Sequence, residues 1–157
     1  MRAKVGSRWI IAGVVLLACG GAAHAQSMLP GGIPPPPGMS LPRSAAMRFP
    51  QPVQVSALLH RDVLQPVPSQ RVLGTVKSIV RNESGAVEAV VEYGGFLGFG
   101  ARPIAVPIDA MVLLGRDMEI VAYSPRQLNH FPTFSAEGTM PVPSDTIIRV
   151  GLAKPSH

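Results

Sequence analysis

The stretch from Val87 to Pro107 constrains the fold most, because it reads as a strand, a glycine-rich loop and a second strand. Apolar residues alternate with glutamates over residues 87–93, and a period of two is typical of a half-buried strand. The loop contains four glycines with three large apolar residues between them, namely Gly94, Gly95, Phe96, Leu97, Gly98, Phe99 and Gly100. Glycine adopts backbone angles closed to other residues, so we expect sharp turns here. The three apolar side chains either cover the open end of a β-structure or contact a partner.

Composition favours an all-β class. The chain has 157 residues with 17 prolines and 16 glycines, which is too many for a mostly helical protein. Valine-rich segments separated by turn residues point to one modest β-domain with extensions. Of the 14 basic residues, three lie within residues 2–8, so 11 basic and 9 acidic residues remain and the net charge falls from +5 to +2. No lysine or arginine cluster is left, which disfavours nucleic-acid binding.

The N-terminus has the pattern of an export signal. Basic residues precede an uncharged, mostly apolar run from Trp9 to Ala18. That run is too short for a membrane span, which takes about 20 residues. Small residues at Ala23 and Ala25 then predict signal-peptidase cleavage before Gln26. We therefore expect residues 1–25 to be removed and the protein to be periplasmic.

A second interpretation of the same segment stays open. The sequence Leu16-Leu-Ala-Cys19-Gly resembles a bacterial lipobox, in which Cys19 would carry lipid and anchor the protein to the membrane. A retained signal segment is a third alternative. Cys19 is the single cysteine, so cleavage at Gln26 leaves no thiol for a disulfide, a nucleophile or a metal site.

Residues 26–52 read as a proline- and glycine-rich linker without lasting periodicity. The run Pro34–Pro37 favours polyproline II, which has no internal hydrogen bonds. We expect a spacer or a disordered leader, and the alternative is a ligand for a proline-binding groove.

The folded part is expected over residues 53–134, followed by a C-terminal extension, residues 135–157, with a candidate last strand at 146–152. Strands are predicted at residues 53–59, 71–81, 87–93, 104–106 and 118–123. Ser124 followed by Pro125 predicts a short helix to Leu128, because serine caps and proline suits the first helical position.

The two strands before the glycine loop should form a hairpin around the turn Asn82–Gly85. The expected register pairs Arg81 with Ala86, Val80 with Val87, Val76 with Val91, Thr75 with Glu92 and Gly74 with Tyr93. Val72, Val76 and Val80 then share a core face, and Lys77 lies near Glu88 and Glu92.

These motifs resemble those of the PRC-barrel family, a small β-barrel found in the photosynthetic reaction-centre H subunit and in a ribosome maturation factor. The resemblance rests on Leu73-Gly-Thr-Val76, the Gly94–Gly100 loop, Ala105-Val-Pro107 and the Pro132-Thr-Phe134 ending. It implies a small PRC-type β-barrel with a short C-terminal helix, acting as an interaction or assembly module without a shared catalytic site. His60 departs from the pattern, since members usually carry glycine there.

No residue set indicates catalysis or a cofactor. The glycine loop lacks the endings of a phosphate-binding loop, and His60, His130 and His157 stand singly, without a second metal ligand at the required spacing. Glu88 and Glu92 share a strand face with Lys77, so charge pairing outweighs a catalytic carboxylate pair.

Two functions from different classes follow. The first is a non-enzymatic, exported interaction or scaffold module with a protein partner in the cell envelope. Phe96, Leu97 and Phe99 would be its contact residues, and Gly74 and the four loop glycines would be structural. Membrane contact follows only if Cys19 is lipidated or the signal segment is retained. The alternative is a small-ligand-binding protein or an enzyme that uses a barrel cavity.

Overall fold

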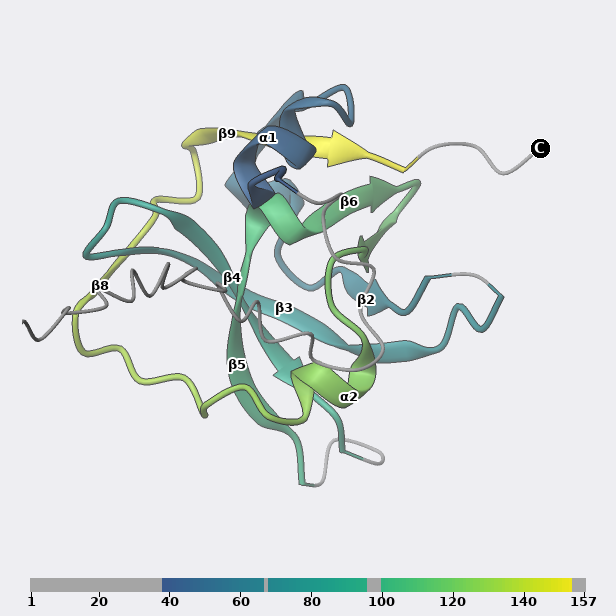
Figure 1. Ribbon diagram of the computed structural model, residues 1–157. Helices are drawn as coiled ribbons and strands as arrows, with labels where there is room; N and C mark the ends of the chain where they lie inside the picture. The colour runs from purple at the N-terminus through teal and green to yellow at the C-terminus, as the bar shows by residue number, and fades with distance from the viewer. Residues whose placement is uncertain (1–37, 67, 96–99, 154–157) are drawn as a thin grey trace, which may run out of the picture.

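The computed structural model describes residues 38–66, 68–95 and 100–153, and within them the protein is mostly β-sheet with a few short helical segments (Figure 1). This agrees with the all-β class that the composition predicts. No helix in these three ranges is long and apolar enough to cross a bilayer. The signal segment and its residues Cys19, Ala25 and Gln26 lie outside the described residues.

The elements follow one another as α1 (Leu41–Ala46), β1 (Gln51–Gln54), the 3-10 helix η1 (Val55–Ala57), β2 (Asp62–Leu64), β3 (Val72–Asn82), β4 (Val87–Tyr93), β5 (Arg102–Pro107), the 3-10 helix η2 (Ile108–Ala110), β6 (Met111–Leu114), β7 (Asp117–Ile120), α2 (Pro125–Leu128), β8 (Thr139–Pro141) and β9 (Ile147–Leu152). Long strands β3, β4 and β5 cross the centre of Figure 1, with α1 and β9 above them and α2 below.

The strands form one open sheet in the order β1-β9-β6-β7-β2-β3-β4-β5, with β8 added to β3. The expected closed barrel is therefore wrong, because no ladder among the described residues joins β1 to β5. Both end strands carry proline, at Pro52 in β1 and at Pro103 and Pro107 in β5. Proline has no N–H to donate to a further strand, so it suits an open edge.

The β3–β4 hairpin forms as expected, but a bulge at Lys77 divides its register. Gly74, Thr75 and Val76 pair with Tyr93, Glu92 and Val91 as predicted. Beyond the bulge the pairing shifts by one residue, so that Val80 faces Glu88 and Arg81 faces Val87. A one-residue shift exchanges the two faces, which explains why Val76 and Ile79, three residues apart, both join the main hydrophobic core.

Two further strand predictions need correction. Val72, expected in the core, is 54% exposed because a second irregularity separates it from the pairing of Val63 with Gly74. The first strand was expected at residues 53–59, but it ends at Gln54 and the chain continues as a 3-10 turn. His60 then adopts a φ of 64°, and its N–H donates to the Val76 carbonyl at 2.8 Å.

The expectation of an unstructured leader up to Pro52 is wrong for its last part. Residues 41–46 form α1, which begins with Leu41 and Pro42, and Leu41 packs against the core while Ser44 is buried. The Arg48 guanidinium donates to the Asp109 carbonyl at 3.1 Å and to Ser44 Oγ at 3.0 Å. An apolar contact and these hydrogen bonds hold the segment on the sheet. Residues 26–37, with the proline run, lie outside the described residues.

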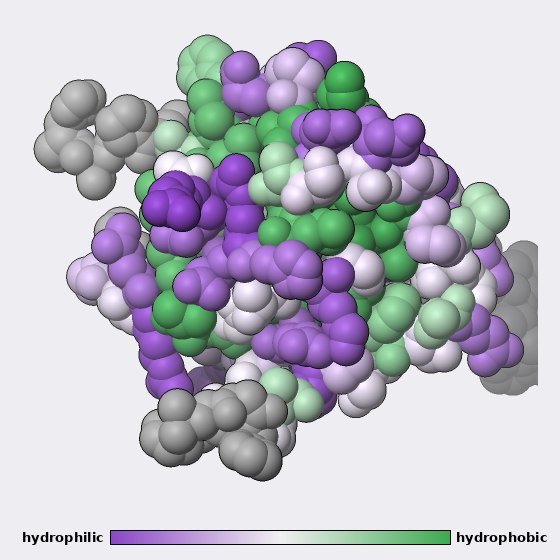
Figure 2. Space-filling model, turned by 180° about the vertical axis from the view of Figure 1, so that it is seen from behind, coloured by the Kyte–Doolittle hydropathy of each residue, from purple (hydrophilic) through white to green (hydrophobic). Residues whose placement is uncertain are grey.

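Strand β9 occupies most of the segment expected as a last strand. It pairs antiparallel with β1 and parallel with β6, and it buries Ile148 and Val150 in the core. The core joins residues from most of the strands with Leu128 of α2. From the side opposite to Figure 1, apolar residues reach the surface between polar ones (Figure 2).

Candidate functional site

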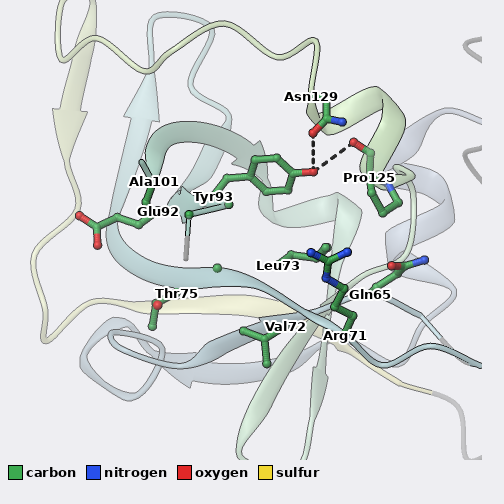
Figure 3. A pocket seen from close by; sticks show the side chains of 13 residues that line it. Gln65, Arg71, Val72, Leu73, Thr75, Glu92, Tyr93, Ala101, Pro125 and Asn129 are labelled. Carbon is green, nitrogen blue, oxygen red and sulfur yellow. Dashed lines mark hydrogen bonds between the residues drawn. The ribbon is translucent and has the colours of Figure 1, made fainter. Parts of the chain in front are cut away.

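A groove of about 540 Å³ lies where β3, the β4–β5 hairpin and α2 meet. Its lining residues are Gln65, Arg71, Val72, Leu73, Gly74, Thr75, Glu92, Tyr93, Gly94, Gly95, Ala101, Pro125 and Asn129. The groove therefore includes both ends of the glycine loop that the sequence singles out. Figure 3 shows these side chains at close range.

Gly74 forms part of the groove because its backbone approaches β4 closely. A Cβ atom on Gly74 would lie 2.1 Å from the Glu92 carbonyl oxygen, which is far inside van der Waals contact. The neighbouring Leu73 carbonyl accepts a hydrogen bond from the Gly94 N–H at 2.8 Å. Gly94 and Gly95 have φ values of 75° and 85°, and these angles turn the chain out of β4. The absence of side chains at these positions makes the space.

Tyr93 forms the wall of the groove next to α2. Its hydroxyl is 2.8 Å from Asn129 Oδ1 and 3.1 Å from the Pro125 carbonyl, so its one proton is shared between two acceptors (Figure 3). Burial raises the pKa of the Tyr93 phenol, and the nearby charges of Arg102 and Arg71 offset part of that increase. Tyr93 thus remains a neutral donor over the physiological range.

Arg102 fastens the C-terminal end of α2 to β5. Its guanidinium donates to the carbonyls of Phe131, Leu128 and Asn129 at 2.6, 2.8 and 2.9 Å. The Leu128 carbonyl ends α2 and also accepts from the Phe131 N–H at 3.1 Å, whereas the Asn129 and Phe131 carbonyls lie just beyond the helix. A cation there suits the partial negative charge at a helix C-terminus. The same guanidinium stacks on the Tyr93 ring at 5.8 Å from its centroid. Arg102 is therefore committed to structure.

The start of α2 confirms the sequence prediction. The Ser124 side chain accepts from the Gln127 N–H at 3.3 Å, and the Gln127 side chain accepts from the Ser124 N–H at 2.8 Å. This reciprocal capping box, with Pro125 at the first helical position, fixes a helix of only four residues. Both ends of α2 are thus held, and the groove has a rigid wall.

The opposite rim of the groove is exposed. Arg71 and Val72 are exposed and Gln65 is half-buried, and Figure 3 shows Arg71 pointing into the space below Tyr93. Glu92 points away from that space and pairs with Lys77 at 2.7 Å. The Lys77–Glu92 pair is solvated and so contributes little stability. The predicted charge pairing of Lys77 is confirmed for Glu92, whereas Glu88 instead accepts from Asn82 Nδ2 at 2.9 Å.

The structure does not bring the other candidates into the groove. His60 is at the turn after η1, and His130 Nδ1 lies 2.7 Å from the Arg126 carbonyl behind α2. Within the described part of the chain, no group of three or more His, Cys, Asp or Glu side chains is placed to hold a metal ion. Phe96, Leu97, Gly98, Phe99 and His157 lie outside the described residues, so the contact role expected of the loop stays a prediction.

Sequence reasoning named most of the groove residues but missed Gln65, Arg71, Ala101 and Asn129. Arg71 and Asn129 come from separate segments, and no motif marks either of them. For Tyr93 there was one indication in the sequence. The predicted hairpin register placed it opposite Gly74, which has no side chain to occupy the space beside the tyrosine ring. That pairing is present.

Comparison of the chain with protein-family models finds no match, and a search of the curated proteins finds none either.

Proposed function

We propose that this chain is a non-enzymatic, exported protein-interaction module, and that its partner binds at the groove beside the glycine loop. The observation that carries this proposal is the difference between the two sides of the groove. The polar groups next to α2 are committed to bonds within the fold, and the exposed rim keeps an arginine and an apolar side chain for contact.

The polar groups next to α2 are engaged in hydrogen bonds within the fold. The Tyr93 hydroxyl is shared between Asn129 and Pro125, and Arg102 donates to three carbonyls. Glu92, a carboxylate that lines the groove, pairs with Lys77 on its outer side. Groups held in this way shape a surface, whereas general acid or base catalysis needs a titratable group within reach of a bound substrate.

The rim supports protein contact. Arg71 is exposed, and Val72 is 54% exposed, although it belongs to a strand whose other apolar side chains are mostly buried. Arginine beside apolar surface is enriched where proteins bind one another. The groove is partly open to solvent, which gives an inserted loop or side chain of a partner access to it.

We also propose that Phe96, Leu97 and Phe99 contact the same partner. Both ends of their loop, Gly95 and Ala101 included, line the groove. Side chains on the segment between Gly95 and Ala101 would therefore be within reach of a partner bound at the groove.

The PRC-barrel family remains the family that we propose for the chain. Its support is the hairpin with Leu73-Gly-Thr-Val76, the close strand approach at Gly74 and the short capped helix that follows. The open sheet differs from a closed barrel, so the likeness is strongest in β3–β5 and α2. Export to the periplasm is proposed from the signal pattern before Gln26, with anchoring through Cys19 as its alternative.

Quantitative capture from the native envelope tests the function. After reversible crosslinking, wild-type protein and a Met140→Asp control should retain the same partner, because Met140 is 66% exposed on β8, outside the groove. Val72→Asp should lose the partner, since it places a charge on the rim. Retention by Val72→Asp, or equal loss in both variants, would contradict the proposed site. A small molecule that copurifies in the groove would favour the ligand-binding alternative.

A further inference from the structure

Three residues with exposed apolar side chains have their backbones next to Arg48, at the corner where α1 meets β1 and β9. Met47 and Phe49 flank Arg48 in the chain, and the Leu152 N–H donates to the Arg48 carbonyl at 2.8 Å. Their exposed fractions are 63% for Met47, 70% for Phe49 and 38% for Leu152. We call these three side chains the corner patch. It lies outside the groove and is independent of the function proposed above.

The fold holds Phe49 in an unusual conformation that keeps it outside. Its φ is 51°, in the left-handed region that a bulky residue rarely adopts. The neighbouring residue is fixed by the hydrogen bonds of Arg48 to Asp109 and Ser44 and by close packing, since a Cβ on Gly151 would lie 3.0 Å from the Arg48 Cβ. The strained backbone of Phe49 is thus maintained by its neighbours, and strain of this kind is often found at functional sites.

The charge around the corner patch is positive. Residues 38–54 and 146–153 contain three arginines, Arg43, Arg48 and Arg149, and no aspartate or glutamate. Arg43 and Arg149 are exposed, and neither forms an ion pair within the part of the chain that the structure describes, although the Arg149 guanidinium donates to the Pro50 carbonyl at 3.0 Å. The nearest acidic residues belong to other segments: Asp109 faces Arg48 from η2, and Asp145 precedes the far end of β9.

The edge of β1 is poorly suited to a second strand. Val55 N–H donates to the Thr146 carbonyl, and alternation along an antiparallel pair then turns residues 51, 53 and 55 toward β9 and residues 50, 52 and 54 outward. Two of the three outward residues, Pro50 and Pro52, lack an N–H. Strand addition by a second copy of the chain is therefore blocked, and the corner patch must act through its side chains.

We propose that the corner patch lies on an anionic phospholipid bilayer. Exposed phenylalanine, methionine and leucine side chains can enter the interfacial region, while arginines beside them bind lipid phosphates. The chain also enters the described fold at this corner, since α1 begins three residues after Gly38.

Tryptophan fluorescence tests this proposal with the full-length protein. Trp9 is the single tryptophan, so a Trp9→Phe background allows Phe49→Trp to report from the corner patch and Met140→Trp to serve as the control. Brominated phosphatidylcholine vesicles, with and without phosphatidylglycerol, should quench residue 49 and leave residue 140 unaffected. Quenching should increase with phosphatidylglycerol. This comparison holds whether or not the N-terminus is itself bound to lipid.

Substitution of the arginines completes the test. Arg43→Gln and Arg149→Gln change exposed side chains, and each should weaken partitioning onto anionic vesicles about fivefold, the effect of one cation near a charged membrane surface. Absent quenching at residue 49, equal quenching at residues 49 and 140, or indifference to both arginines would overturn the proposal. A dimer in sedimentation that Phe49→Ala abolishes would assign the patch to a second copy instead.

Discussion

Replacing Gly74 with alanine should force β3 away from β4 and destabilise the whole sheet. The new Cβ would lie 2.1 Å from the Glu92 carbonyl oxygen, 2.9 Å from its carbonyl carbon and 3.0 Å from Val91 Cγ1. Atoms in ordinary contact are separated by about 3.5 Å, so the strands must move apart by roughly 1 Å. Two of the three obstacles are backbone atoms in the hairpin ladder, and they cannot yield by changing a rotamer.

Overpacking of this kind typically costs about 1–3 kcal/mol and occasionally more, and the rigidity of the obstacle places Gly74→Ala at the upper end. A domain of this size has about 5–15 kcal/mol of stability in total. Urea denaturation followed by circular dichroism measures the change in free energy of unfolding.

Gly85→Ala is the matched control for that measurement. Gly85 has a φ of 84°, and no atom lies within 4 Å of the point that a Cβ would occupy, so alanine there brings backbone strain of about 1–2 kcal/mol and no clash. Gly74→Ala should be clearly the less stable of the two. Equal unfolding midpoints for Gly74→Ala and wild type would refute the close-approach argument.

Three other predictions concern the groove and the N-terminus. Burial raises the pKa of Tyr93 in the folded protein above its value in the unfolded chain, which is about 10. The contribution of Tyr93 to stability is therefore complete below the unfolded-state pKa and is lost as pH rises through the folded-state pKa. In urea titrations, Tyr93→Phe should flatten this alkaline loss of stability. Arg102→Met removes three hydrogen bonds to carbonyls, and a loss of about 2–3 kcal/mol with faster amide exchange in α2 is expected, whereas unchanged exchange would show that Arg102 does not hold the helix. Intact-mass measurement of the exported protein should give a chain that begins at Gln26, and a lipid-modified Cys19 at the N-terminus would reject that cleavage.

The sequence predicted those features that depend only on residues close together in the chain. Ser124 and Pro125 define a helix start on their own, and Asn82–Gly85 defines a turn, so α2 and the β3–β4 hairpin are present where expected. The bulge at Lys77 left no comparable signal. A bulge depends on which strand lies across the sheet, and β8, which pairs with β3 beyond Lys77, comes from a segment more than 50 residues later in the chain.

Long-range features escaped the sequence for the same reason. Arg102 donates to carbonyls at the end of α2, and Arg48 donates to a carbonyl of η2. The structural role of each arginine therefore depends on backbone from another part of the chain. The helix α1 lies in a segment rich in proline and glycine, where composition predicted no structure. Its burial of Leu41 and Ser44 depends on β9 and η2, which the sequence does not place beside it.

Site-specific photocrosslinking in the native envelope tests whether a protein partner binds at the groove. A benzophenone side chain at position 72 stands on the groove rim, and one at position 140 stands at a somewhat more exposed position outside the groove. A partner at the groove should give a discrete protein adduct from position 72 that Arg71→Glu weakens, and no such adduct from position 140. The same adduct from both positions, or none from position 72, would contradict a partner-binding groove.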